Sequence, residues 1–155
     1  MNNNDVLRSL RYMLDISEPA MVKIFKLGAQ EVTPADIASF LRGEEDEGYE
    51  ACMDATMLGF LNGLVAFKRG ENKEVSDPNF KPEKNISNNI ILKKLRVAFE
   101  LKDLDMHEVF AKADYQISKP ELSALFRKPG HSNYRACGDQ ILRYFLKGLT
   151  LRLRA

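Results

Sequence analysis

One internal duplication limits the folds open to this chain more than any other feature of its sequence. Shifted by 85 residues without a gap, positions 3–70 align with positions 88–155 and share 17 identical residues. Unrelated stretches of that length and ordinary composition would share roughly four. The chain therefore contains two copies of one structural unit. The identical residues of the first copy are Asn3, Asn4, Leu7, Leu10, Arg11, Met21, Phe25, Arg42, Tyr49, Ala51, Cys52, Asp54, Phe60, Leu61, Gly63, Leu64 and Arg69.

Each copy has four segments with the apolar periodicity of an α-helix. In the first copy they follow a cap at Asn3 or Asn4, a cap at Ser17 and a cap at Thr33, and the fourth starts with Asp54 as its cap. These residue types favour helix N-caps because their side chains accept hydrogen bonds from free backbone N–H groups. No segment keeps the alternation of a strand. We predict an all-α protein, a tandem duplication of a roughly four-helix unit with about eight helices in total.

The segment between the two copies lacks helical periodicity. Residues 71–87 contain two prolines and many polar residues, so we predict a linker between helical repeat 1, residues 1–70, and helical repeat 2, residues 88–155.

Two glycines and two Arg–Asp combinations recur at equivalent positions. Gly63 and Gly148 interrupt the fourth helix of each copy at a cost of about 1 kcal/mol each, which predicts the close approach of another helix, most simply across the interface between the copies. We expect the recurring Arg and Asp to form one ion pair in each copy, between the first helix and the residue that caps the fourth helix. These pairs are Arg11–Asp54 and Arg96–Asp139.

The composition is that of an ordinary globular protein. It is 45% hydrophobic and 29% charged, and it has neither an apolar run of about 20 residues nor a basic N-terminal segment followed by an apolar one. We therefore expect a cytoplasmic protein without a membrane partner. Cys52 and Cys137 are equivalent positions, and in that compartment we expect them to stay reduced and to fill space in the core.

Three phrases of the sequence resemble the YehS-like family of bacterial proteins. They are NNDVLRSLRY at 3–12, FLNGL at 60–64 and ELSALFRKPGHSNYRACGDQILRYFLKGL at 121–149. The resemblance covers nearly the whole chain. It implies a small cytoplasmic bacterial protein of two similar helical domains, with no established activity, substrate or catalytic residue to carry over.

The sequence contains no recognisable catalytic constellation. Its two histidines, His107 and His131, occupy unrelated positions of the repeat and have no metal-ligating residue at a helical spacing. It also lacks a glycine-rich phosphate loop. We predict a non-enzymatic protein without a cofactor or a metal. The alternative is an active site assembled from residues that are distant in sequence.

The loop before the fourth helix has opposite charge in the two copies. We call residues 42–50 the acidic loop, with a net charge of -4, and residues 127–135 the basic loop, with a net charge of +3. The candidate binding residues of the basic loop are Arg127, Lys128, His131, Tyr134 and Arg135. Their acidic counterparts are Glu44, Glu45, Asp46 and Glu47. The simplest interpretation of such a charge run is a solvated loop.

Two functions compete with that interpretation. The first is an interaction protein whose oppositely charged loops bind another macromolecule, preferably a protein, with self-association included. The second is a nucleic-acid-binding protein that uses a basic face of the second copy. An acidic first copy would repel phosphate, and the pI is about 7.7, so we favour the first function. The predicted basic face comprises Arg127, Lys128, Arg135, Arg143, Lys147, Arg152 and Arg154.

Overall fold

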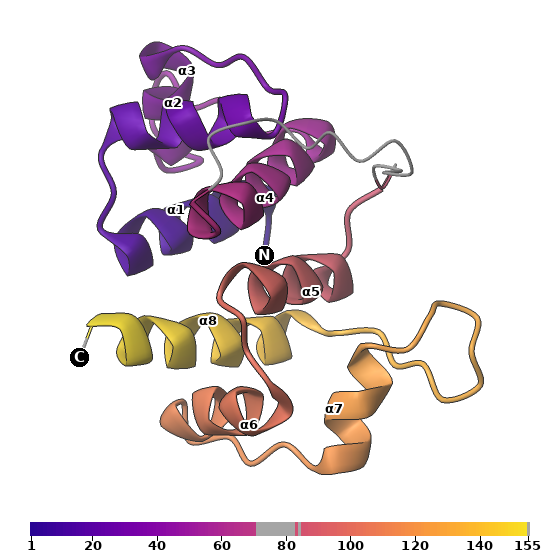
Figure 1. Ribbon diagram of the computed structural model, residues 1–155. Coiled ribbons are helices and arrows are strands. Elements are labelled where there is room, and N and C mark those ends of the chain that lie inside the picture. Colours follow the sequence, from indigo (N-terminus) through magenta and orange to yellow (C-terminus); the bar gives the residue numbers. More distant parts are fainter. Residues whose placement is uncertain (71–82, 84, 155) are drawn as a thin grey trace. The chain divides into compact units, whose positions relative to one another are not determined.

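The computed structural model describes residues 1–70, 83 and 85–154, and within them all regular structure is helical (Figure 1). The predicted all-α fold and its duplication are thereby confirmed. The chain divides into two compact units, Met1–Ile86 and Ser87–Ala155. Most of the segment predicted as a linker lies outside the described residues. The helices of the first unit are α1 (Asn3–Leu14), α2 (Glu18–Leu27), α3 (Pro34–Leu41) and α4 (Asp54–Lys68). Those of the second are α5 (Asn88–Ala98), α6 (Asp103–Lys112), α7 (Lys119–Leu125) and α8 (Asp139–Arg154).

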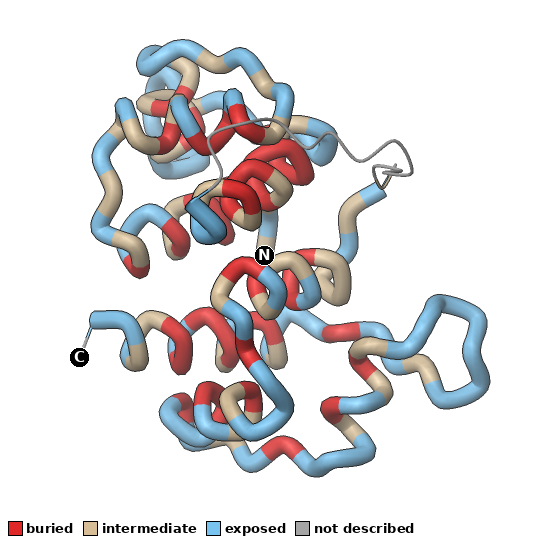
Figure 2. Tube along the Cα trace, in the orientation of Figure 1, coloured by how far each residue is buried: buried red, intermediate tan, exposed pale blue. Residues whose placement is uncertain are grey.

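The core of the first unit forms where α2 packs on α4. Phe25 of α2 is fully buried, and its ring lies 4.8 Å from that of Phe60 on α4 and 6.3 Å from that of Phe40 on α3, measured between centroids. Burying such aromatic side chains is the main favourable contribution to folding. Figure 2 shows the buried positions of these helices on their inner faces.

The second unit repeats this arrangement with one added aromatic pair. Phe110 on α6 faces Phe145 on α8 with 5.8 Å between ring centroids. Tyr115 stacks on Tyr144 at 4.8 Å, where the first unit has Gln30 and Gly59. Leu153 continues the apolar spacing of Leu142, Leu146 and Leu149, which predicts a buried side chain, but it is 41% exposed near the end of α8, so that prediction is wrong.

The predicted caps of the second and third helices are correct, whereas those of the first and fourth helices are wrong. Ser17 caps α2, and Thr33 caps α3 in a reciprocal box with Asp36. Asn2 caps α1 and Ser87 caps α5, one residue before the asparagines shared by the two copies. Helices α4 and α8 begin at Asp54 and Asp139 as predicted, but the residue in the cap position of α4 is Met53, which makes no side-chain cap.

The shared asparagines instead tie the first helix of each unit to the loop before the fourth. The amide of Asn4, 1% exposed, donates to the carbonyls of Phe40 at 3.0 Å and Glu50 at 2.9 Å, and its oxygen accepts from the N–H of Cys52 at 2.9 Å. The amide of Asn3 donates to the carboxylate of Asp54 at 2.9 Å. These bonds explain why the two asparagines are identical in both copies.

The second unit contains the same set of hydrogen bonds. Asn89 donates to the carbonyls of Leu125 at 3.0 Å and Arg135 at 2.9 Å and accepts from the N–H of Cys137 at 2.8 Å. Asn88 donates to the carboxylate of Asp139 at 2.8 Å. An identical bond set 85 residues later shows that these polar groups belong to the fold.

The predicted ion pairs are wrong. Asp54 is bound by Asn3, and Arg11 makes no ion pair with it. Arg96 binds a carboxylate of α6 instead of Asp139, with 2.6 Å between its guanidinium and the Asp103 oxygen. The asparagines already supply donors to Asp54 and Asp139, so the arginines are left for other contacts.

The recurring glycines lie where α4 and α8 meet the second helix of their own unit. A Cβ at Gly63 would be 1.8 Å from the carbonyl oxygen of Ile24 on α2. At Gly148 it would be 1.9 Å from the carbonyl oxygen of Val109 on α6. The predicted close approach is therefore confirmed, but its placement across the interface between the copies is wrong.

Candidate functional site

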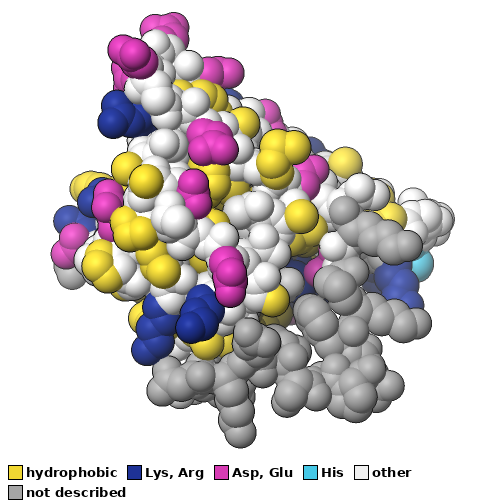
Figure 3. Space-filling model, turned by 90° about the horizontal axis from the view of Figure 1, so that it is seen from above, with side chains coloured by type: hydrophobic (Ala, Val, Ile, Leu, Met, Phe, Trp, Pro, Cys, Tyr) yellow, Lys and Arg dark blue, Asp and Glu magenta, His cyan; other side chains and the backbone are white. Residues whose placement is uncertain are grey.

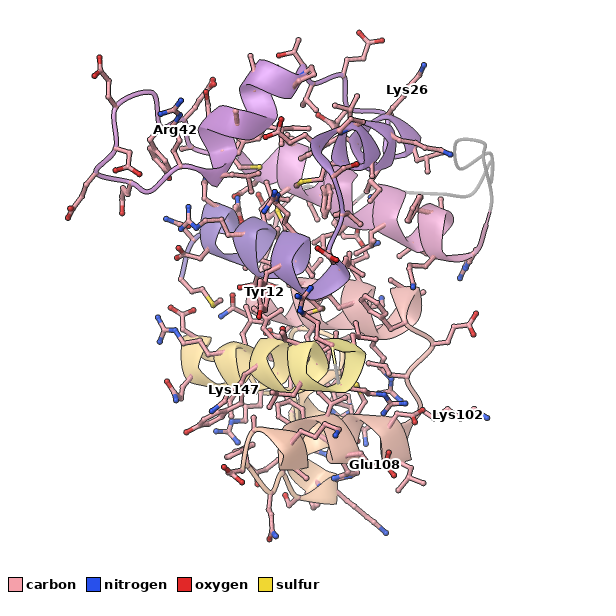
Figure 4. All side chains as sticks on the ribbon, turned by 90° about the vertical axis from the view of Figure 1, so that its left-hand side faces the viewer. Tyr12, Lys26, Arg42, Lys102, Glu108 and Lys147 are labelled. Carbon is pink, nitrogen blue, oxygen red and sulfur yellow. The ribbon has the colours of Figure 1, made fainter. Side chains whose placement is uncertain are left out.

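The acidic loop follows α3 and is folded by its own polar groups. The carboxylate of Asp46 accepts a backbone hydrogen bond within the loop at 3.0 Å. The Arg42 guanidinium donates to the carbonyl of Glu47 at 3.1 Å. In Figure 4 the loop next to Arg42 carries carboxylates that point away from the helices, and Figure 3 shows Asp and Glu side chains gathered on a projection at the upper edge of the view. Within this loop the carboxylates of Glu44, Glu45, Glu47 and Glu50 are exposed and make no hydrogen bond or ion pair with the described residues.

The basic loop follows α7 and projects from the second unit (Figure 1). Arg127 and Lys128 are exposed, and neither side chain has a partner among the described residues. The backbone N–H of His131 donates to the carbonyl of Lys128 at 3.0 Å, and that of half-buried Tyr134 donates to the carbonyl of His131 at 3.0 Å. Consecutive turns thus present Arg127, Lys128 and His131 to solvent.

Arg135 differs from the other basic-loop residues because it is paired. Its guanidinium lies 3.0 Å from the carboxylate of Glu121, which also accepts from the Tyr115 hydroxyl at 3.2 Å. Hydrogen bonds from Ser118, and then from Arg135, hold the pKa of Glu121 below its usual value. Arg135 therefore contributes less unbalanced positive charge than Arg127 and Lys128.

Beside the basic loop the second unit has a hollow that the sequence did not predict. Its volume is about 790 Å³, and it lies between α5, α6 and α7, with Arg127 contributed by the basic loop itself. We call it the α5–α7 groove. Its lining consists of Arg96, Asp103, Leu104, His107, Lys119, Leu122, Ser123, Phe126 and Arg127.

Arg96 is a fixed part of the groove wall. Its guanidinium binds the carboxylate of Asp103 at 2.6 Å, donates to the carbonyl of Leu101 at 2.9 Å and lies 4.7 Å from the centre of the Phe126 ring. These contacts satisfy Asp103, the one carboxylate in the lining. The signal that would have revealed the groove is a difference between the copies, because His107, Lys119 and Ser123 replace apolar residues of the first copy.

The two cysteines are buried and free, as predicted. Burial, with a smaller contribution from Asp54, raises the pKa of the Cys52 thiol to about 12. Burial likewise raises the pKa of Cys137 to about 11, with Asp139 adding to the effect. Both thiols are therefore protonated at neutral pH, whereas nucleophilic attack requires the thiolate.

The fold and the loop charges together define the class of protein: two small helical units in tandem, with an acidic loop before the fourth helix of the first unit and a basic loop at the equivalent place in the second. The chain belongs to the family described as protein of unknown function (DUF1456), which matches residues 3–70 and again residues 88–155. It is 47% identical over 152 residues to the uncharacterized protein YehS of Escherichia coli (strain K12), covering 98% of this chain and 96% of that protein. No solved structure matches the chain. None of the described helices is long and apolar enough to cross a membrane.

Proposed function

We propose that this protein is not an enzyme and that it binds a protein partner through its oppositely charged loops. The observation that carries the proposal is that equivalent loops of one duplicated fold present unpaired charges of opposite sign. The fold requires neither the acidic nor the basic charges, since the first unit forms the same helices without the basic loop residues and the second forms them without the acidic ones. Opposite charges on exposed surfaces raise association rates and select partners.

The partner that these charges fit directly is a second copy of the chain. Glu44, Glu45 and Glu47 of one molecule would meet Arg127 and Lys128 of another. One such contact alone is heterologous and leaves a free loop on each molecule; if both molecules exchange loops reciprocally, the arrangement is two-fold and closes into a dimer. It would weaken with salt, because exposed charges are screened over about 8 to 10 Å at physiological ionic strength.

Sedimentation velocity at about 50 and 200 mM salt tests this proposal. We expect the wild type to associate more at the lower salt concentration. The variant E44K/E45K/E47K and the variant R127E/K128E should each sediment as monomers, since each carries two loops of like charge. An equimolar mixture of the two variants should associate again, because both loops of the first variant are basic and both loops of the second are acidic. A mixture that stays monomeric would contradict loop-to-loop association. A second experiment compares the proteins captured from a cell lysate by the wild type and by E44K/E45K/E47K. If, in addition, the wild type captures no protein that the variant fails to capture, protein binding through the loops is excluded.

A second candidate function, nucleic-acid binding, is favoured by exposed cations on α8 of the second unit. Arg143 and Lys147 are exposed one helical turn apart on α8. Other members of the basic face are already neutralised. Arg135 binds Glu121, and Arg152 lies 3.1 Å from Asp105 and 3.6 Å from Glu108. The smaller number of available cations supports protein binding over this alternative.

Fluorescence anisotropy with short single-stranded and double-stranded nucleic acids decides between the two functions. Phosphate contacts would give binding that falls steeply between about 50 and 200 mM salt. The variant R143E/K147E should then abolish it, while E44K/E45K/E47K should leave it intact. Absence of binding at the lower salt concentration would leave protein binding as the function of the basic loop.

A further inference from the structure

The α5–α7 groove is rich in hydrogen-bond donors that have no partner. The side chains of Lys119 and Arg127 are exposed, and neither makes an ion pair with the described residues. The imidazole of His107 and the hydroxyl of Ser123 likewise make no hydrogen bond within that part of the chain. Lys and Arg only donate, and His and Ser can each donate, so a group that can accept from all four is one with several oxygens.

The charge of the lining also favours an anion. Arg96, Lys119 and Arg127 carry three positive charges against the single carboxylate of Asp103, without counting His107. Asp103 is already bound by Arg96 at 2.6 Å, so it does not neutralise the other two cations.

The rest of the lining is apolar. Leu104 of α6 is 70% exposed, whereas Leu122 of α7 is 3% exposed and Phe126 is half-buried. Small-molecule sites combine such apolar surface with a few polar groups in hollows of roughly 300 to 1,000 Å³. The volume of about 790 Å³ falls within that range. This combination matches a ligand with a charged end and an apolar body.

The first unit supplies an internal comparison. At the positions 85 residues earlier, Val22 replaces His107, Pro34 replaces Lys119 and Ala38 replaces Ser123. The first unit forms the same helices without these donors, so the fold does not require them. Their presence in one copy only indicates a role that belongs to the second unit.

We propose that the α5–α7 groove binds a small organic anion, a phosphate or carboxylate attached to an apolar group. Lys119, Arg127, His107 and Ser123 hold the oxygens, and Leu104, Leu122 and Phe126 contact the apolar body. This site goes beyond the proposed protein binding and shares only Arg127 with the basic loop.

Titration of the ¹⁵N-labelled full chain, followed by heteronuclear NMR, tests the site with phenyl phosphate and phenylacetate as probes. Inorganic phosphate and phenol, each carrying half of the required chemistry, are the comparisons. We expect the aromatic anions to shift the amide signals of His107, Leu104 and Ser123 and to bind more tightly than either comparison compound. Binding by phenyl phosphate alone identifies phosphate as the charged group, and binding by phenylacetate alone identifies carboxylate.

Variants separate this site from the loop function. K119Q/R127Q should weaken binding at least about tenfold, since glutamine can still donate a hydrogen bond but lacks the positive charge that strengthens it. H107V and S123A, which introduce the residues of the first unit, should each weaken it less. K128Q, outside the groove, should leave binding unchanged, and the signals of Val22 and Ala38 should not move. Equal affinity for inorganic phosphate, shifts spread over all basic residues, or binding unaffected by K119Q/R127Q would overturn the proposal. These results are independent of whether the loops associate.

Discussion

Gly148→Ala is expected to lower the free energy of unfolding by about 3 kcal/mol, the upper end of the range for overpacking a core. The added methyl carbon would lie 1.9 Å from the carbonyl oxygen of Val109, and a backbone atom cannot move aside by changing rotamer. Helices α6 and α8 would have to separate, which loosens the contact between Phe110 and Phe145. Alanine gains about 1 kcal/mol of helix propensity over glycine, which is too little to offset the loss.

Denaturant unfolding of matched variants measures this effect. Gly63→Ala should cost a similar amount, because its methyl carbon would be 1.8 Å from the carbonyl oxygen of Ile24. Gly138→Ala is the control: a Cβ there meets nothing within 4 Å. That control should be neutral or stabilise by about 0.5 kcal/mol through the unfolded state. If Gly148→Ala is as harmless as Gly138→Ala, the close approach of α6 and α8 is refuted.

The location of these glycine contacts illustrates what the sequence could and could not predict. Helices and most helix ends follow from local features, such as apolar periodicity and the Thr33–Asp36 capping box, so they were predictable. Glycines at equivalent positions indicated a close approach, but periodicity does not identify the neighbouring helix. A contact between Gly63 and Ile24 depends on how α2 and α4 cross. That crossing is set by the packing of side chains distant in sequence.

The asparagines were misassigned for a related reason. Asn beside the start of a helix is a good local cap, and nothing nearby in the sequence indicated partners 36 to 48 residues away. The candidate site likewise has features that the sequence could predict and features that it could not. Loop charges can be counted in the sequence, whereas the pairing of Arg135 with Glu121 and the α5–α7 groove require the packed helices.

Asn4→Ala should lower the free energy of unfolding by about 3 kcal/mol, from three lost hydrogen bonds of about 1 kcal/mol each. The carbonyls of Phe40 and Glu50 and the N–H of Cys52 would lose their partner. Asn4→Asp should be at least as harmful at neutral pH, because a carboxylate would face two carbonyl oxygens. Asp has nearly the same volume as Asn but cannot donate these hydrogen bonds at neutral pH. A loss of stability in Asn4→Asp as well as in Asn4→Ala would therefore show that the hydrogen bonds donated by the amide stabilise the fold.

The equivalent change in the second unit links stability to the candidate site. Asn89 holds the carbonyl of Arg135 and the N–H of Cys137, so Asn89→Ala should free the end of the basic loop. The cost should be smaller than at Asn4, because one of its bonds is exposed to water, which can replace the lost partner. Hydrogen exchange at the Cys137 amide should rise, and loop-dependent association should weaken through lost preorganisation. Asn133→Ala, an exposed position of the same loop, is the control and should leave exchange and stability unchanged within about 0.5 kcal/mol. Unaltered exchange at Cys137 in Asn89→Ala would mean that the loop is held by other contacts.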